Sequence, residues 1–302
     1  MELITGENDK GRRLDRILRK ALPDHPLPLI HRLLRQKQVL VNGTPAKAQY
    51  RLGSGDIINI HCLKNTKKTA VLSESKIYPQ IIFKNSEFLA VNKPAGISVH
   101  GPESLDTIVQ SLLAGMIQPS LSFKPGPMHR LDRMSSGIVV FSVSLEGAHL
   151  FSLLLREQKI KKTYLTIVDG IVEKEELWKD YLFRDCEKKK TFVSQVNSQN
   201  SKIAITKIKP LFSSGSYSLI IAEIVTGRTH QIRAQAAFHG HPLTGDIKYG
   251  SKSNAKKSDF FLHAWKLEFL DYSFKAPLPL SFNKKIKELF KDLDMDTYCI
   301  PD

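Results

Sequence analysis

The stretch that decides the fold is MHRLDRMSSGIVVFSVS, residues 128–144. Its first half packs one acid, Asp132, between two arginines, and two serines and a glycine then lead into a strand-like run. Flanking cations favour the ionised form of an aspartate, and a Ser-Ser-Gly turn lets the backbone approach a bound ligand closely. An ionised carboxylate held in such a loop is a candidate nucleophile or general base. On these residues alone, a structural Arg–Asp pair in a turn explains the pattern equally well.

A second segment, TGRTHQIR at residues 226–233, follows another strand-like run and opens a predicted helix. Thr226 or Thr229 is a candidate N-cap of that helix. Arg228 and Arg233 both suit a phosphate or carboxylate partner. The segment is therefore a candidate for binding an anion.

Short β-rich runs surround both segments from about residue 77 onward. Two helices interrupt them, over residues 146–157 and 229–240. The predicted strands lie within residues 81–94, which hold two strands and a polar turn, and within 137–144, 163–172, 216–225 and 260–270. Because strands outnumber helices, the sequence favours an α+β domain with an antiparallel-rich sheet over a doubly wound one. The stretch 185–202 is expected to form a long hairpin or surface excursion.

The first 63 residues are a separate predicted module. Apolar residues at helical spacing predict helices over 14–22 and 29–34, and an Asn42-Gly43 turn with a strand at 57–60 predicts a short hairpin. Residues 1–70 carry 14 Lys and Arg against 6 Asp and Glu, or +8, whereas the other 232 carry 31 against 24, or +7. This concentration favours a polyanion-binding module over a merely solvated helix face. A polar linker is predicted at residues 64–76.

Composition excludes several classes of protein. The 302 residues, 41% of them hydrophobic, suffice for about two globular domains. No apolar run is long enough to span a bilayer, and the charged N-terminus does not resemble a secretory signal. Cys62, Cys186 and Cys299 lie far apart, and His239 and His241 have no acidic or Cys cluster beside them. We therefore expect a cytoplasmic protein with no disulfide scaffold, metal site or membrane association.

Taken together, these segments resemble an RluA-type pseudouridine synthase with an N-terminal S-four-like RNA-binding domain. Residues 129–137 match the family's catalytic loop, with Ser135 in place of the usual Thr. Further matches follow the family's order at residues 91–100, 162–165, 227–233, 240–246 and 262–264. The N-terminal module is similar at residues 13–15, 39–43 and 55–56, although Lys37 stands where a glycine is usual.

The resemblance implies the domain organisation and the chemistry. It implies a small α/β S-four-like domain over residues 1–63, the linker 64–76, and an α+β catalytic domain with an antiparallel-rich mixed sheet over 77–302. The family isomerises uridine in RNA to pseudouridine without metal or cofactor. An RNA-binding domain on this catalytic type favours large-subunit ribosomal RNA over transfer RNA, and we expect a monomer.

Residue roles follow by match. Asp132 is the implied catalytic carboxylate, Arg233 pairs with it, and Tyr164 lies against the uracil. Leu262 forms an apolar wall, and Arg130 enters the gap that the flipped base leaves. The expected RNA contacts are Arg228, Lys93, Arg13, Arg16, Arg32 and Arg35.

Two other classes of function remain as alternatives. The first is a non-catalytic RNA-binding protein on the same fold, against which the intact set of Asp132, Tyr164 and Arg233 argues. The second is a metal-dependent RNA hydrolase, which the lack of a clustered carboxylate or His/Cys ligand set disfavours.

Overall fold

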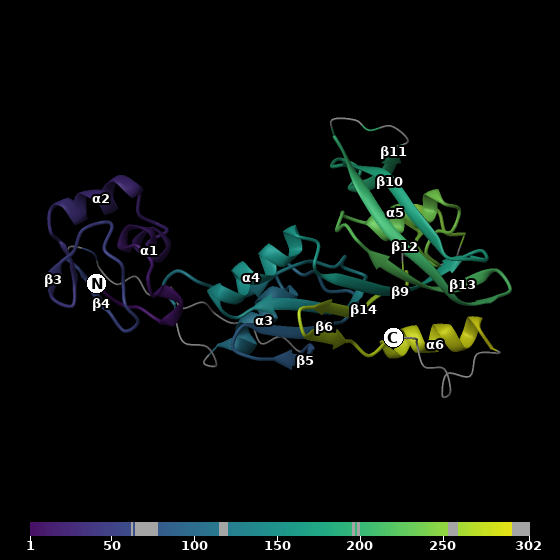
Figure 1. Cartoon of the computed structure of the whole chain (residues 1–302), viewed down its shortest axis with the longest axis horizontal. Coiled ribbons are helices and arrows are strands. Elements are labelled where there is room, and N and C mark those ends of the chain that lie inside the picture. The colour runs from purple at the N-terminus through teal and green to yellow at the C-terminus, as the bar shows by residue number, and fades with distance from the viewer. Residues whose placement is uncertain are drawn as a thin grey trace.

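A computed structural model describes residues 1–61, 63, 78–114, 120–194, 197, 200–252 and 259–291. The predicted linker, 64–76, lies outside them, so the predicted boundaries at residues 63 and 77 stay predictions. The described residues form a four-stranded and an eleven-stranded sheet (Figure 1). Within these ranges, no helix is long and apolar enough to cross a membrane.

The four-stranded sheet and two helices make up the N-terminal module. In chain order, its elements are β1 (Glu2–Ile4), the 3-10 helix η1 (Glu7–Asp9), α1 (Leu14–Ala21), α2 (Leu27–Arg35), β2 (Val39–Val41), β3 (Thr44–Pro45) and β4 (Ile57–Ile60). Apolar residues of α1 and α2, such as Ile17 and Leu33, pack against Ile58 of the sheet in one core. The Asn42-Gly43 turn joins β2 to β3, with both residues at positive φ, as expected for a two-residue hairpin loop.

The large sheet carries the rest of the described chain. Its elements are β5 (Gln80–Lys84), β6 (Phe88–Lys93), α3 (Leu105–Leu113), β7 (Gly126–Pro127), β8 (Ser136–Ser142), α4 (Leu145–Arg156), β9 (Lys161–Asp169), β10 (Glu176–Asp185), β11 (Lys190–Ser194), β12 (Ser201–Ser214), β13 (Tyr217–Ile224), α5 (Gln231–Phe238), η2 (Ile247–Tyr249), β14 (Leu262–Phe269), β15 (Tyr272–Lys275) and α6 (Leu280–Leu289). The strand order is β11-β10-β12-β13-β9-β14-β8-β6-β5, with β15 beside β14 and β7 beside β8. Among the described strands only β8 and β14 pair in parallel. The antiparallel-rich mixed sheet of an α+β fold is thereby confirmed.

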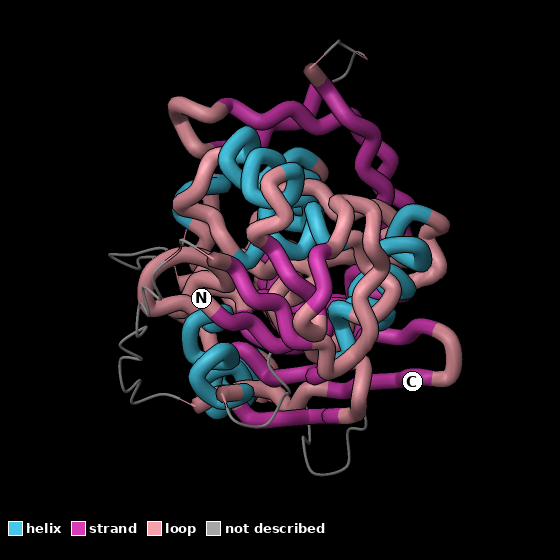
Figure 2. Tube along the Cα trace, turned by 90° about the vertical axis from the view of Figure 1, so that its left-hand side faces the viewer, coloured by secondary structure: helices cyan, strands magenta, loops and turns pink. Residues whose placement is uncertain are grey.

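Alternate residues of a strand point to opposite sides, and both faces of the sheet are buried along β6, β8 and β9. Leu89 and Val139 belong to the core cluster that includes the apolar side of α3. Their neighbours Phe88 and Ile138 pack on the other face with Phe151 of α4. Figures 1 and 2 show the helices distributed around the sheet, with the end formed by β10 and β11 at the top in both views. Strands buried on both faces fix the positions of the loops that join them.

The central strand β9 separates the site from the C-terminal helix. Tyr164 and Val168 of β9 share a core with Ile232 of α5. Leu165, one residue along, packs instead with Phe282 of α6. Tyr164 and α5 therefore lie on the same side of the sheet.

One buried carboxylate links the N-terminal module to the large sheet. Oδ1 of Asp9 accepts hydrogen bonds from the hydroxyls of Ser120 and Ser122 at 2.8 and 2.6 Å, and Oδ2 accepts from the Leu121 amide at 2.9 Å. Burial alone would raise the pKa of Asp9, but these hydrogen bonds and one from the Gly6 amide outweigh it and hold the pKa below its usual range. The two modules are therefore joined by a charged contact that no short-range sequence pattern reveals.

Candidate active site

The loop that carries Asp132 lies between β7 and β8 and is fixed at both ends. Before Asp132, the buried side chain of Leu131 anchors the loop in the core. After it, Gly137 opens β8 at φ +110 and lies so close to Ala264 of β14 that a Cβ would overlap its backbone. Only glycine combines this φ with this close approach. The turn after the acid falls at Arg133-Met134 and not at the predicted Ser-Ser-Gly, and Gly137, within β8, lets the two parallel strands approach closely.

Arg233 of α5 connects Asp132 to a second acid. Its Nη1 donates to Oδ2 of Asp132 at 2.9 Å, while Nε and Nη2 donate to the two oxygens of Asp246 at 2.6 and 2.9 Å. The guanidinium carbon lies 4.8 Å from the ring centroid of Tyr249 and 4.2 Å from that of Phe260. Burial would lower the pKa of Arg233, but Asp246 and then Asp132 raise it above its usual value. The arginine is therefore held as a cation in one orientation by two acids and two rings.

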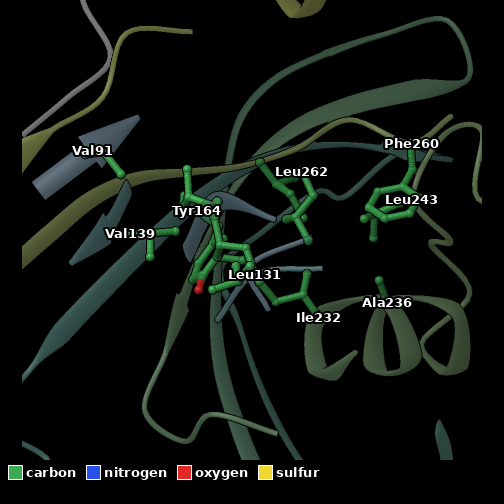
Figure 3. Packing of buried hydrophobic residues seen from close by; sticks show 14 of the residues in the cluster. Val91, Leu131, Val139, Tyr164, Ile232, Ala236, Leu243, Phe260 and Leu262 are labelled. Atoms are coloured by element: carbon green, nitrogen blue, oxygen red, sulfur yellow. The ribbon is translucent and has the colours of Figure 1, made fainter. Parts of the chain in front are cut away.

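Apolar side chains close the site around the acid. Figure 3 shows Tyr164, Leu131, Ile232 and Leu262 in one packing cluster. Tyr164 is 7% exposed, and burial, with a further contribution from Asp132, raises the pKa of its phenol above the usual range. The phenol is therefore neutral at physiological pH. A face of Tyr164 and the side chain of Leu262 line a small cavity of about 60 Å³ that Asp132 also borders.

A hydroxyl in this cavity lacks a partner. Ser135 also lines the cavity and is 1% exposed, and within the described residues its Oγ makes no hydrogen bond. A buried polar group without a partner is costly, so such groups are uncommon in native structures. The Ser135 hydroxyl is thus an enclosed donor next to the cavity that has no partner among the described residues.

His230 is a site residue that the sequence analysis missed. It has φ 55 and ψ 25, and it is the N-cap residue of α5 without a side-chain capping bond, so the predicted cap by Thr226 or Thr229 is wrong. Its Nε2 lies 3.8 Å from Oδ2 of Asp132, and its Nδ1 lies 2.8 Å from the Tyr249 hydroxyl. Burial lowers the pKa of His230 to about 4, although Asp132 acts to raise it. The imidazole is therefore neutral at physiological pH. The sequence signal that could have identified His230 is its place between Arg228 and Arg233.

Of the expected RNA contacts near the site, two are exposed and one is not. Arg130 and Arg228 are exposed and border the cavity, and Nε of Arg228 donates to the Ile203 carbonyl at 3.0 Å. Lys93 is fully buried, and its Nζ donates to the carbonyls of Pro94, Ile97 and Arg133. The expectation of an RNA contact at Lys93 is corrected, because its ammonium instead ties an early turn to the Asp132 loop.

The arginines expected in the N-terminal module are placed apart from this site. Arg13, Arg16, Arg32 and Arg35 are exposed on or next to α1 and α2, at the opposite end of the molecule from α5 (Figure 1). Arg13 pairs with Asp15 at 2.7 Å. The four residues therefore add positive charge to the surface of the N-terminal module, and RNA contact there stays a prediction.

Within the described ranges, no three His, Cys, Asp or Glu side chains gather where they could hold a metal ion. The chemical groups that converge are one carboxylate held by an arginine, a neutral phenol, a neutral imidazole and a hydroxyl without a partner.

Comparison with known proteins identifies the family. The model of the RNA pseudouridylate synthase family matches residues 87–238, about half of the chain, and includes Asp132, Tyr164 and Arg233. The chain belongs to the RNA pseudouridylate synthase family. The synthase is thus an enzyme that isomerises uridine in RNA to pseudouridine, and the S4 domain model matches its residues 12–58. Both resemblances predicted from the sequence are confirmed.

Curated relatives cover most of the synthase. It is 31% identical to ribosomal large subunit pseudouridine synthase C of Vibrio parahaemolyticus over 87% of this chain and 86% of that one. It is 30% identical to the synthase C of Rickettsia bellii over 93% and 99% of the two chains, and to the synthase D of Neisseria meningitidis over 89% and 76%. Human RNA Pseudouridylate Synthase Domain Containing 4 shares the fold, with a TM-score of 0.59 and 23% identity over 69% of this chain and 92% of that one.

Proposed function

We propose that the synthase isomerises uridines of large-subunit ribosomal RNA, with Asp132 as the catalytic carboxylate. The observation that carries this proposal is the contact between Arg233 and Oδ2 of Asp132 at the edge of the cavity lined by Tyr164 and Leu262. The names of the curated relatives support the choice of RNA. Transfer RNA is the alternative substrate.

The orientation of Asp132 suits one reactive oxygen. Within the described residues Oδ2 has partners, whereas no hydrogen bond or ion pair involves Oδ1. Oδ1 is therefore free either to attack the nucleoside or to remove a proton from its sugar, which gives a glycal. In both routes the bond between the uracil nitrogen and C1′ breaks, the uracil rotates, and its C5 bonds to C1′ with loss of the C5 proton.

The cavity walls hold the detached uracil during this rotation. Tyr164 presents an aromatic face for stacking, and Leu262 supplies an apolar wall. Because the target must leave its stack to reach Asp132, we assign Arg130, which is exposed, to the gap that the base leaves in the RNA.

The N-terminal S4 domain supplies affinity rather than chemistry in this proposal. Its exposed arginines suit phosphate contacts, which carry most of the sequence-independent affinity for a nucleic acid. With a ribosomal RNA substrate, we infer a cytoplasmic location. We also propose that the synthase is a monomer. Sedimentation of the protein at micromolar concentration tests this inference.

The substrate is tested by mapping pseudouridine across total RNA from a deletion strain and its parent. We expect specific sites in large-subunit ribosomal RNA to lose pseudouridine when the gene is deleted and to regain it on complementation. Loss only from transfer RNA would overturn the choice of RNA.

A further inference from the structure

A second, larger cavity lies beside the catalytic one. Its volume is about 420 Å³, and the two cavities share Arg130, Asp132 and Tyr164 in their walls. The wall beyond the shared part comes from the end of α4 and the start of β9, with Arg156 and Lys162. A ligand in the catalytic cavity would therefore continue directly into this space.

The larger cavity has a cationic lining. Four cations border it, Arg130, Arg156, Lys162 and Arg228, whereas its lining contains one carboxylate, that of Asp132. Asp132 already has Arg233 as its counter-charge. The excess of positive charge favours an anionic ligand.

Lys162 is the unusual member of this set. It is 9% exposed, and within the described part of the chain no hydrogen bond or ion pair involves its ammonium. The next residue, Lys161, is exposed on the other face of β9 and lies 3.4 Å from Glu223 and 4.0 Å from Glu268. The other buried lysine, Lys93, has three carbonyl acceptors. The Lys162 side chain lines the cavity and its Nζ is not enclosed by protein, so an anionic ligand in the cavity would supply the partner that the protein does not.

The imidazole of His129, which lines the same cavity, has no free hydrogen-bond acceptor for Lys162. Nε2 of His129 accepts a hydrogen bond from the Val140 amide at 3.1 Å, so its lone pair is occupied. Burial and then Lys162 lower the pKa of His129 to about 3, and the ring is neutral. Burial also lowers the pKa of Lys162 to about 8, as expected for an ammonium that lacks a counter-charge.

We propose that Lys162 lies at the bottom of a phosphate subsite that binds the RNA backbone next to the target uridine. The exposed arginines at the rim, Arg130 and Arg156, would complete the coordination of the phosphate. Lys162 and Tyr164 are two residues apart on β9 and face the same side, about 7 Å from each other along the strand. A phosphate on Lys162 is therefore within a nucleotide's reach of a uracil on Tyr164. This proposal rests on RNA being the substrate, and it assigns Lys162 to binding.

The test compares Lys162→Met with Lys161→Met, a matched control on the opposite face of the same strand. The probe is an in vitro transcript of large-subunit ribosomal RNA, and its Kd is measured against salt concentration. We expect Lys162→Met to raise the Kd several-fold and to reduce the salt slope by roughly 0.7–0.9, the value for one phosphate. The control should retain the parental Kd within about two-fold, because its ammonium is exposed and paired. Parental Kd and slope for Lys162→Met would overturn the subsite.

A second measurement uses the unmodified protein and does not depend on the folding of a variant. Acetic anhydride labels amines at pH 8, and peptide mass spectrometry compares the labelling of Lys162 and Lys161 with and without the transcript. The proposal predicts that RNA protects Lys162 several-fold more than Lys161, and equal protection would contradict it.

The failure of the subsite and the failure of the proposed function are distinguishable. If the parent forms no pseudouridine but Lys162→Met binds RNA more weakly than the parent, the subsite is sustained and the proposed function is overturned. Pseudouridine formation by the parent, together with unchanged RNA binding by Lys162→Met, would overturn the subsite and sustain the proposed function.

Discussion

Nη1 of Arg233 and Oδ2 of Asp132 are 2.9 Å apart, although 101 residues separate them in the sequence. The remaining donors of the same guanidinium bind both oxygens of Asp246. Arg233 therefore acts as a fixed link between an acid that borders the cavity and an acid that is fully buried. The planar arrangement of its donors makes this link possible, and a lysine has no equivalent geometry.

Removing the guanidinium should affect catalysis and stability together. We expect Arg233→Ala to lower the single-turnover rate by orders of magnitude and to destabilise the fold by about 3–5 kcal/mol, because it removes the cation that binds both oxygens of buried Asp246. Arg233→Lys should rescue only part of the rate. Arg228→Ala should instead raise KM more than it lowers kcat. Parental turnover by Arg233→Ala, or a larger loss of kcat in Arg228→Ala, would show that the two arginine roles are misassigned.

Asp246 is predicted to be a positioning residue. Asp246→Asn cannot accept both hydrogen bonds from Arg233, so the guanidinium should tilt and Asp132 should lose its orientation. We expect kcat to fall by about 10²-fold with little change in KM. The matched control is Asp180→Asn, because Asp180 binds Gln235 and His239 at the same helix without touching Arg233. Equal kcat losses in both variants would indicate a general effect on α5 instead.

Much of this architecture was predictable because it depends on local patterns. The β-rich runs predicted the strands β5, β6, β8, β9, β13 and β14, helical spacing predicted α1 and α2, and two helical stretches between the strands predicted α4 and α5. The turn at Asn42-Gly43 was predicted from its residue types. Lys37 has φ 55, the left-handed conformation that the usual glycine at this position would adopt without strain.

Two helices that the sequence analysis missed carry local signals. Helix α3 starts at a Ser104 cap and buries Leu105, Ile108 and Leu113 at helical spacing, and α6 follows Pro279.

The other features that were missed depend on contacts between distant segments. The burial of Lys93 depends on an acceptor 40 residues away, at Arg133. The partner of Asp9 lies more than 110 residues away. Such pairings require the folded chain.

Stability should depend on pH through Lys162. Burial lowers the pKa of Lys162 from 10.5 to about 8 in the folded state. Between about pH 8 and 10.5 the unfolded chain therefore binds more protons than the folded one, so this residue makes the unfolding free energy rise with pH. We expect Lys162→Met to be more stable than the parent at pH 7 and the difference to shrink by up to about 3 kcal/mol as pH rises to 10.5. Denaturant unfolding of both proteins at several pH values checks this. A difference in unfolding free energy that does not change with pH would contradict the cost assigned to burying the Lys162 ammonium.

Deleting residues 1–63 should leave a folded catalytic domain, since the rest of the chain has its own core. The deleted part carries 11 Lys and Arg against 6 Asp and Glu, or +5. We therefore expect weaker binding to the transcript and a smaller salt slope. The control is the full-length variant Asp9→Ala, which keeps every cation of the S4 domain but breaks its contact with Ser120 and Ser122. A salt slope unchanged by the deletion would show that the S4 domain does not anchor RNA.

The most direct test of the central claim is tritium release from an RNA transcript labelled at C5 of uridine. Isomerisation replaces the C5–H bond by a C5–C1′ bond, so each turnover releases the label to water. We predict release by the parent and none by Asp132→Asn, with RNA binding by the variant within several-fold of the parent, because affinity comes mainly from the basic surface. Sustained release by Asp132→Asn, beyond any reversion through deamidation, would contradict the assignment of Asp132 as the catalytic carboxylate.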